Sequence, residues 1–314
     1  MGGAGRIAVL FPGQGSQYVG MAKEFLEKSG EARDLMAVAE KVSAMPLGRL
    51  CLDGPMEELT RTLYLQPAMT VVNLICWQEL ARAGVKADFF AGHSLGEYAA
   101  LCVAGVLSVE DTLTLVTERG RLMEREAGKN PGGMQAVVKL GIETVREIVA
   151  VAQAKGALTV ANHNSAEQIV ISGEAAALEA AAELVKERGG KAIPLKVSGA
   201  WHSDLIKGAV PDFEEAMARV QFSAPHTPLL FNATAAAESD PAAIRTIMAR
   251  QIASTVRWYE IVQQLMAAEV RVFIEVGPKT VLTGLLKKII PADYAHQALQ
   301  VDTPATLAQC LGAL

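Results

Sequence analysis

The sequence predicts an α/β protein whose large domain is interrupted by a smaller inserted domain. Its 314 residues exceed the usual size of one compact core, which favours a large domain with an insert or two unequal lobes. Near the N-terminus, a short apolar run enters a turn rich in glycine and is followed by helical patterns. Between residues 128 and 197 the expected order of elements is β-α-β-β-α-β. These three observations define the predicted architecture.

The elements of the N-terminal part follow from apolar periodicity and turn residues. The apolar run at residues 7–11 stops at Pro12-Gly13-Gln14-Gly15-Ser16, as a buried strand does when it enters a tight loop. Helices are expected at 21–28, 68–83, 95–104 and 108–126, and a short buried strand at 87–91. A strand, a turn at 92–96 and a helix therefore follow one another directly.

The inserted domain begins after a turn-forming stretch, Gly128-Lys129-Asn130-Pro131-Gly132-Gly133. Strands are expected at 135–140, 158–161, 168–172 and 191–197, helices at 142–155 and 175–188, and a loop at 162–167. This order is the ferredoxin-like arrangement, so we assign residues 128–197 to a ferredoxin-like small domain. Residues 1–127 and 198–314 form the large domain, which ends with further helices and a strand at 270–276.

The composition argues against several classes of protein. A net charge of −5 and a pI near 5.7 give no electrostatic reason to bind nucleic acid or an anionic membrane surface, and no apolar window approaches the ~18 residues of a spanning helix. Four widely spaced cysteines indicate reduced thiols and a cytoplasmic protein: Cys51, Cys76, Cys102 and Cys310. We expect no metal site, because no close ligand cluster occurs, and no nucleotide cofactor, because Gly13-Gln14-Gly15 lacks the third glycine of the dinucleotide motif.

Gly92-His93-Ser94-Leu95-Gly96 fits the pattern G-x-S-x-G. Flanking glycines let a strand turn sharply into a helix and hold the serine hydroxyl outward, and the helix N-terminus directs amide donors at a developing oxyanion. The pentapeptide alone is a weak signal, since Gly and Ser are common. The strand before it and the helix after it strengthen the prediction that Ser94 is a nucleophile.

A serine nucleophile needs a base, and the sequence offers five histidines. His202 follows Trp201 at the point where the insert returns to the large domain, and domain junctions are common places for an active site. The alternative is a structural histidine with satisfied hydrogen bonds. His93 adjoins the serine, and we expect it to point to another side and brace the loop.

Several motifs in one order make the chain similar to the malonyl-CoA:acyl-carrier-protein transacylase family over nearly its whole length. The motifs that carry the resemblance are Phe11-Pro12-Gly13-Gln14-Gly15-Ser16-Gln17, Gln66-Pro67-Ala68, Gly92-His93-Ser94-Leu95-Gly96-Glu97-Tyr98, Arg119-Gly120, Ala161-Asn162, Trp201-His202-Ser203, Gln251, Val256-Arg257-Trp258 and Glu275-Val276-Gly277-Pro278. The resemblance implies an α/β-hydrolase-like catalytic domain around the ferredoxin-like insert.

The resemblance also implies a ping-pong acyl transfer in which Ser94 attacks malonyl-CoA, His202 is the base and a carrier-protein thiol then takes the acyl group. The family orients its histidine with a backbone carbonyl, and Gln251 occupies the matching position. Backbone N–H groups of Gln14 and Leu95 would form the oxyanion hole.

Arg119 is the residue that would select the acyl group, because a guanidinium binds a carboxylate through two parallel hydrogen bonds. The alternative is an ordinary exposed helix arginine, since Arg121 and Arg125 lie close by. By the same resemblance, Gln66 and Asn162 are expected in substrate binding. No cofactor is implied beyond the coenzyme A thioester itself.

Three positions depart from the usual family pattern: Trp201, Asp204 and His163. A tryptophan before the proposed base would narrow the acyl pocket and disfavour methylmalonyl groups. Asp204 either raises the pKa of His202 or caps the next helix, and we favour the cap.

Two alternative hypotheses about the function of the same residues stay open. A hydrolase would use Ser94 and His202 on water, and a carrier-docking scaffold would retain the site without using it. For the acidic carrier protein we expect a basic docking site at Arg188 and Lys191, although such charges are usually only solvated. We expect a monomer that supplies fatty-acid synthesis, since the chain carries no fused synthase domains; the sequence leaves a polyketide pathway open.

Overall fold

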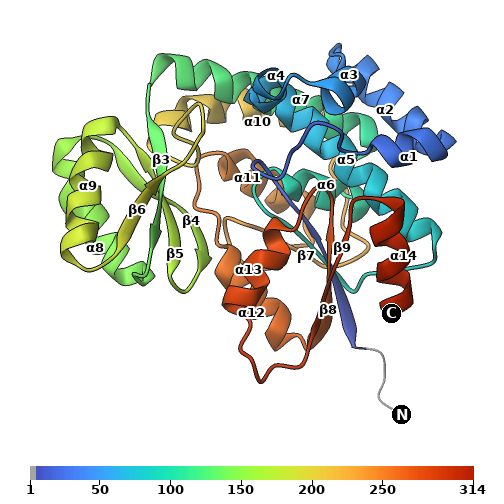
Figure 1. Cartoon of the computed structure of the whole chain (residues 1–314). Helices are drawn as coiled ribbons and strands as arrows, with labels where there is room; N and C mark the ends of the chain where they lie inside the picture. The colour runs from blue at the N-terminus through green and yellow to red at the C-terminus, as the bar shows by residue number, and fades with distance from the viewer. Residues whose placement is uncertain (1–4) are drawn as a thin grey trace.

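The computed structural model describes residues 5–314, so residues 1–4 of the predicted large domain lie outside the described residues. The large domain is built on a five-stranded parallel sheet with the order β7-β2-β1-β8-β9. Figure 1 shows this sheet on one side of the molecule and a second, smaller sheet on the other. The strands of the large sheet are β1 (Arg6–Phe11), β2 (Phe89–Gly92), β7 (Leu229–Leu230), β8 (Val270–Val276) and β9 (Gln297–Val301).

Helices cover both faces of the large sheet. Along β1, Val9 and Phe11 pack into one apolar core and Ala8 and Leu10 into another, as the two-residue period of a strand requires. The first core takes side chains from α1 (Lys23–Lys28), α2 (Gly30–Ser43), α3 (Leu47–Asp53), α4 (Met56–Thr60), α5 (Thr62–Arg82), α6 (Gly96–Val103), α7 (Val109–Lys129), α10 (Val210–Ala218), α11 (Pro241–Gln251) and α14 (Pro304–Ala313). The second takes them from α12 (Trp258–Ala267) and α13 (Val281–Ile289).

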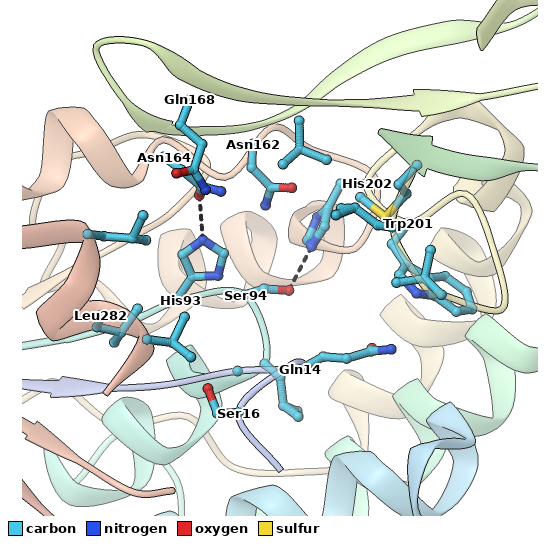
Figure 2. A pocket seen from close by; sticks show the side chains of 18 of the residues that line it. Gln14, Ser16, His93, Ser94, Asn162, Asn164, Gln168, Trp201, His202 and Leu282 are labelled. Atoms are coloured by element: carbon cyan, nitrogen blue, oxygen red, sulfur yellow. Dashed lines mark hydrogen bonds between the residues drawn. The ribbon is translucent and has the colours of Figure 1, made fainter. Parts of the chain in front are cut away.

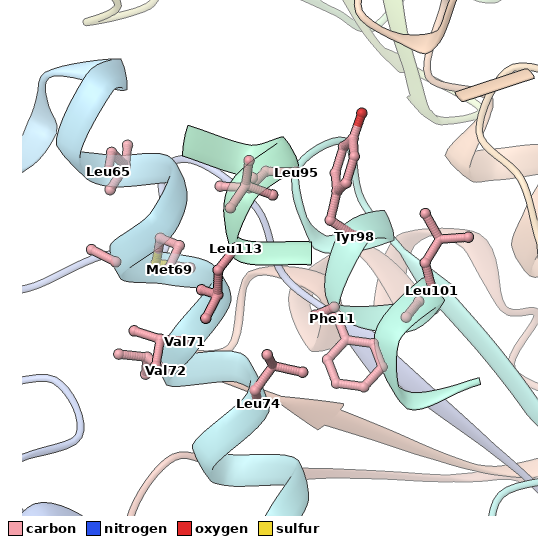
Figure 3. Packing of buried hydrophobic residues seen from close by; sticks show 14 of the residues in the cluster. Phe11, Leu65, Met69, Val71, Val72, Leu74, Leu95, Tyr98, Leu101 and Leu113 are labelled. Carbon is pink, nitrogen blue, oxygen red and sulfur yellow. The ribbon is translucent and has the colours of Figure 1, made fainter. Parts of the chain in front are cut away.

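The turn after β2 rests on the first of these cores. The start of α6 packs on α5, and Leu95 and Tyr98 share one apolar core with Leu65 and Met69 of α5 (Figure 3). Each of these four side chains is fully or almost fully buried. Burying an aliphatic or aromatic side chain stabilises a fold by ~1.5 to 3 kcal/mol, so the start of α6 is firmly held.

The small domain contains a four-stranded antiparallel sheet with the order β4-β5-β3-β6. Its elements are β3 (Gly133–Val138), α8 (Ile142–Ala152), the 3-10 turn η1 (Gln153–Lys155), β4 (Leu158–Ser165), β5 (Gln168–Gly173), α9 (Ala175–Glu187) and β6 (Lys191–Pro194). One face of the sheet packs on α8 and α9 through Val137, Ile169 and Ile171. The other face, with Met134 and Val170, joins the core of the large domain. That second face is the one turned toward the large domain.

The predicted loop at 162–167 is wrong, because β4 continues to Ser165. Asn162 and His163 pair with β5, and the backbone N–H of His163 also donates to the Val256 carbonyl of the large domain at 2.8 Å. Polar residues stay in the strand here because two neighbouring segments satisfy their backbone groups. The strand expected to reach residue 197 ends at Pro194, and proline cannot donate to a ladder.

The predicted α/β class and the ferredoxin-like strand order are confirmed. The helix expected from residue 68 begins at Thr62 and contains Pro67, and a 3-10 turn, η2 (Asp204–Ala209), follows the insert. The domain boundaries at 127/128 and 197/198 stay predictions. None of the helices within residues 5–314 combines the length and the apolar character needed to cross a membrane.

Candidate active site

A cavity of about 190 Å³ lies between the turn after β2 and the inner face of the small sheet. Figure 2 shows Ser94 and His202 pointing toward each other in it, with Asn162 and Asn164 above and Gln14 below. Its walls are formed by Gly13, Gln14, Ser16, His93, Ser94, Leu95, Arg119, Met123, Met134, Asn162, Asn164, Gln168, Val170, Leu195, Val197, Trp201, His202, Val281, Leu282 and Leu285. Ser94, His202, Arg119, Gln14, Leu95 and Asn162, which the sequence predicts as site residues, are therefore brought together.

Ser94 occupies a strained turn between β2 and α6. Its φ is +51°, a left-handed conformation that costs free energy for a residue with a side chain. Gly92 and Gly96 make the turn possible, because a Cβ on Gly92 would overlap the backbone of Gly96 and one on Gly96 would overlap the Phe11 carbonyl. The glycines of G-x-S-x-G are thus required by close backbone approach on both sides of the serine.

Asn232, which follows the short strand β7, holds this turn from behind. Its side-chain Oδ1 accepts from the Ser94 backbone N–H at 2.6 Å, and its Nδ2 donates to the Gly92 carbonyl at 2.7 Å. Asn232 is fully buried. The sequence analysis missed this residue, since 138 positions separate it from Ser94 and no local pattern marks it.

His202 lies against the Ser94 hydroxyl, with its Nε2 at 2.6 Å from Ser94 Oγ. Its Nδ1–H points at two backbone carbonyls, those of Gln251 at 3.1 Å and Ser254 at 3.0 Å. Because Nδ1 donates, Nε2 is the acceptor for the serine proton. Two carbonyls thus take the orienting role that a carboxylate has in a Ser-His-Asp triad, and the carbonyl of Ser254 is one the sequence did not indicate.

The environment of His202 favours the neutral imidazole. Burial, followed by the positive charge of Arg119, lowers its pKa from the ordinary 6.5 to about 3. A neutral imidazole is the form that accepts a proton from a hydroxyl. His202 is therefore able to accept a proton from the Ser94 hydroxyl.

Arg119 is buried on α7, with 1% of its surface exposed. Its Nη1 donates to Gln66 Oε1 at 2.8 Å, and its Nη2 donates to Gln251 Oε1 at 3.0 Å and lies 3.4 Å from Ser94 Oγ. Its Nε is buried without a hydrogen-bond partner in the described part of the chain. Its burial excludes the alternative of an exposed helix arginine, and the Nε–H is a donor that stays unused.

Gln66 and Asn162 take different places around this cluster. Gln66 lies behind Arg119 and outside the cavity wall, and its Nε2 donates to Thr62 Oγ1 at 2.9 Å. Asn162 lines the cavity from β4. Asn162 thus faces the cavity, whereas Gln66 contacts it only through Arg119.

The backbone N–H groups predicted for an oxyanion hole belong to Gln14 and Leu95, which both line the cavity. Gly13 packs on the turn so closely that a Cβ there would overlap the His93 carbonyl and stand 3.5 Å from the Leu95 nitrogen. Among the hydrogen bonds of residues 5–314, none uses either N–H group as a donor. Both are available to a developing oxyanion beside Ser94.

His93 points away from the nucleophile, as expected. Its Nε2 lies 2.8 Å from Asn164 Oδ1, and its ring meets that of Trp258 edge to face at 5.5 Å between centroids. Figure 2 shows the contact between His93 and Asn164, which joins the turn to the small domain. Burial lowers the pKa of His93, so it too favours the neutral form.

Two of the three departures from the family pattern lie outside the cavity. The expectation that Asp204 caps the next helix is wrong, because Ser203 Oγ accepts from the Leu205 N–H at 3.3 Å in that role. Asp204 faces solvent, 3.9 Å from Lys207, and is not among the causes that shift the pKa of His202. His163 stacks on Tyr259 and lies 3.1 Å from Glu260, whereas Trp201 lines the cavity.

The two predicted docking residues lie on the small domain. Arg188 ends α9, which packs on the sheet face turned from the cavity, and it pairs with Glu147 of α8 at 3.2 Å. Lys191 is exposed at the start of β6. Within residues 5–314 no cluster of His, Cys, Asp or Glu side chains is arranged to hold a metal ion.

Comparison with known proteins places this cavity in context. Residues 9–302 match the model of the acyl transferase domain. The chain is 39% identical over 304 residues to a malonyl CoA-acyl carrier protein transacylase of Bacillus subtilis, covering 96% of this chain and 95% of that protein. A crystal structure of an acyl carrier protein S-malonyltransferase from Vibrio cholerae superposes with a TM-score of 0.92 at 37% identity, over 97% of this chain and 99% of that one. A malonyl-transacylase in complex with its type II PKS acyl-carrier protein gives a TM-score of 0.94 at 33% identity, over 98% and 100% of the two chains.

Proposed function

Since the chain belongs to the malonyl-CoA:acyl-carrier-protein transacylase family, we propose that it moves a malonyl group from coenzyme A to the pantetheine thiol of an acyl carrier protein. The observation that carries the proposal is the contact of 2.6 Å between Ser94 Oγ and His202 Nε2, with Arg119 Nη2 3.4 Å from the same oxygen. A nucleophile, its base and a carboxylate-binding cation thus meet at one point.

In the first half-reaction, the Ser94 oxygen attacks the thioester carbonyl of malonyl-CoA while its proton passes to His202 Nε2. The negative charge on the carbonyl oxygen is stabilised by the N–H groups of Gln14 and Leu95, each contributing ~3 to 4 kcal/mol in comparable sites. When the tetrahedral intermediate collapses, the C–S bond breaks and His202 returns the proton to the departing thiolate. A malonyl ester remains on Ser94.

In the second half-reaction, the carrier thiol gives its proton to His202, and its sulfur attacks the ester carbonyl. The C–O bond to Ser94 breaks, and His202 hands the proton back to the serine oxygen. The hydrogen bonds from Nδ1–H to the Gln251 and Ser254 carbonyls stabilise the imidazolium that exists between these transfers. The kinetics are ping-pong because coenzyme A leaves before the carrier thiol attacks the malonyl ester on Ser94.

Arg119 selects a dicarboxylic acyl group in this proposal. The free carboxylate of malonyl would bind the guanidinium beside Ser94, with Asn162 contributing its amide from the opposite wall. An acetyl group offers no such partner, so the buried cation would keep only its amide contacts, at a cost on the order of 1 to 3 kcal/mol. Trp201 narrows the same pocket, which disfavours a branched methylmalonyl group.

The carrier protein is proposed to dock through a basic surface of the small domain that includes Arg188 and Lys191. The support is electrostatic, because an acidic partner needs a local basic patch on a chain of net charge −5. Charge reversal at both positions should raise the KM for the carrier and spare loading from malonyl-CoA; equal loss of both steps would argue against the assignment. We further propose a monomer that needs no cofactor and supplies fatty-acid synthesis.

A two-step mass measurement tests the proposed function. Wild type and Ser94→Ala are exposed briefly to malonyl-CoA. The mass of the intact protein is then measured by mass spectrometry, before and after addition of carrier protein that bears its pantetheine thiol. The expected result is a malonyl adduct in wild type alone, which moves to the carrier with little free malonate. Rapid release of malonate without the carrier would instead indicate a hydrolase, and carrier binding without any adduct would indicate a scaffold.

A further inference from the structure

Glu97 is a fully buried carboxyl group that the reaction steps above leave unused. It lies in the first turn of α6, three residues after Ser94, and does not line the cavity. Its Oε1 accepts from the Asn232 backbone N–H at 2.8 Å, and its Oε2 accepts from Gln251 Nε2 at 2.8 Å. Burial raises the pKa of Glu97 to about 8, although the hydrogen bonds from Asn232 and Gln251 and the charge of Arg119 act in the opposite direction.

The side-chain amide of Gln251 connects this carboxylate to Arg119. Its Nε2 donates to Glu97 Oε2 and to the Ser94 carbonyl, both at 2.8 Å, and its Oε1 accepts from Arg119 Nη2 at 3.0 Å. An amide has one accepting end and one donating end. Because both oxygens of Glu97 accept N–H groups and Oε2 takes the NH₂ end of the Gln251 amide, Glu97 decides which end of that amide faces the guanidinium.

The same carboxylate also supports the nucleophile turn. The Asn232 N–H that binds Glu97 Oε1 belongs to the residue whose side chain holds the Ser94 N–H and the Gly92 carbonyl. Glu97 is therefore linked to Ser94 through Asn232 and to Arg119 through Gln251. A buried network of this kind specifies one arrangement when every member is satisfied.

We propose that Glu97 is a positioning residue that sets the preference for a carboxylate-bearing acyl group by fixing the Gln251 amide and, through it, the Nη2 donor of Arg119. This inference rests on the proposed function, in which Arg119 binds the acyl carboxylate. An uncharged acyl group makes no use of that donor, so its loading depends on Ser94 and His202 but not on the position of the guanidinium.

The test compares malonyl with acetyl loading of Ser94 in wild type, Glu97→Gln and Gln251→Met. In Glu97→Gln the shape of the side chain is kept, but its NH₂ group opposes either the Gln251 NH₂ or the Asn232 N–H. Since the Asn232 N–H is fixed in the backbone whereas the Gln251 amide can rotate, the NH₂ group takes the Gln251 side, the amide of Gln251 turns, and Arg119 loses its acceptor. We expect the ratio of malonyl to acetyl loading rates to fall by about tenfold, the usual scale for one lost partner of a buried charged donor. Gln251→Met removes the connecting amide but retains the carbonyl that binds His202, and it should lower the ratio to the same degree.

Glu275→Gln is the matched control. Glu275 is equally buried and its oxygens also accept two N–H groups, here from the backbone of Leu282 and Thr283, but it binds neither Gln251 nor Arg119. Its replacement should lower the melting temperature and leave the loading ratio unchanged. In the double variant of Glu97→Gln and Gln251→Met, the ratio should fall no further than in either single variant.

Each outcome decides the matter. An unchanged ratio in Glu97→Gln with a wild-type preference for malonyl would overturn the positioning role and leave the proposed function standing. Should Glu97→Gln fail to fold, an unchanged ratio in Gln251→Met alone overturns it. A wild type without malonyl preference would instead be a failure of the proposed function.

Discussion

The two walls of the cavity differ in their chemistry. The wall from the large domain carries every charged or titratable side chain that lines the cavity: Arg119, His93 and His202, together with Ser94. The wall from the small domain carries the amides Asn162, Asn164 and Gln168 and the apolar side chains Met134, Val170, Leu195 and Val197. We propose from this difference that the reaction takes place on the large-domain wall, while the small-domain wall supplies shape and neutral hydrogen bonds.

The largest expected effect lies on the large-domain wall, at His202. We predict that His202→Asn lowers the single-turnover rate of Ser94 acylation by malonyl-CoA by about a thousandfold or more, because the serine loses its base. Asparagine suits the position, since His202 has a φ of +58° and asparagine tolerates the left-handed region. Quenched-flow mass spectrometry measures the rate, and a melting curve close to that of wild type is the control. If the acylation rate fell by only a few-fold, another residue would have to be the base.

The next effect concerns the rigidity of that wall. Gly96→Ala should lower the free energy of unfolding by at least ~2 kcal/mol, because its Cβ would overlap the Phe11 carbonyl in a fully packed turn. Gly128→Ala is the matched control, as nothing lies within 4 Å of a Cβ at that exposed position of α7. This control should stabilise the protein by ~0.5 to 1 kcal/mol. Urea and thermal unfolding measure both effects. Equal unfolding midpoints for the two variants would contradict the close approach of Gly96 to the Phe11 carbonyl.

The third prediction uses pH to separate a buried base from an exposed one. The pKa of His202 is lowered from 6.5 to about 3, so the imidazole stays neutral as the pH falls through the ordinary range. Acylation by malonyl-CoA should therefore change by less than about twofold between about pH 7 and about pH 5. A histidine with an unshifted pKa would lose about thirtyfold over that interval. An acid limb with its midpoint near the ordinary value would show that the site is more solvated than described.

The smallest effect is expected on the small-domain wall. Asn162→Ala should raise the KM for malonyl-CoA by about threefold to tenfold with little change in kcat, since a neutral amide contributes ~0.5 to 1.5 kcal/mol. Steady-state kinetics at several malonyl-CoA concentrations check this. If kcat instead fell by two orders of magnitude or more, the small domain would share in the chemistry and the contrast between the walls would fail.

The sequence predicts the parts of this site that are local. The turn around Ser94 joins β2 to α6 within a few residues, so its glycines and its flanking elements can be recognised in one stretch of sequence. The partners of that turn cannot be predicted in this way, because Asn232, Gln251 and Ser254 come from distant segments that only packing brings near. Family resemblance led to the Gln251 carbonyl, but the second carbonyl, from Ser254, and the role of Glu97 depend on side-chain positions.

Errors of the sequence analysis have a similar origin. The polar residues at 162–165 have a loop composition, yet they continue β4 because β5 and Val256 satisfy their backbone groups. Asp204 has the right type for a helix cap, but Ser203 precedes it with an extended backbone and takes that role. Local preference loses in both cases to a neighbour that composition alone does not reveal.

We propose above all that Ser94 carries the acyl group as an ester, and that Arg119 selects this group by binding the free carboxylate of the acyl group. Intact-protein mass after brief exposure to malonyl-CoA, acetyl-CoA or methylmalonyl-CoA, in wild type and Arg119→Ala, tests it most directly. We expect a malonyl adduct on wild-type Ser94 in clear excess over the other two adducts, and loss of that excess in Arg119→Ala. A wild type that takes up none of the three groups, or an Arg119→Ala variant that keeps the malonyl preference, would contradict it.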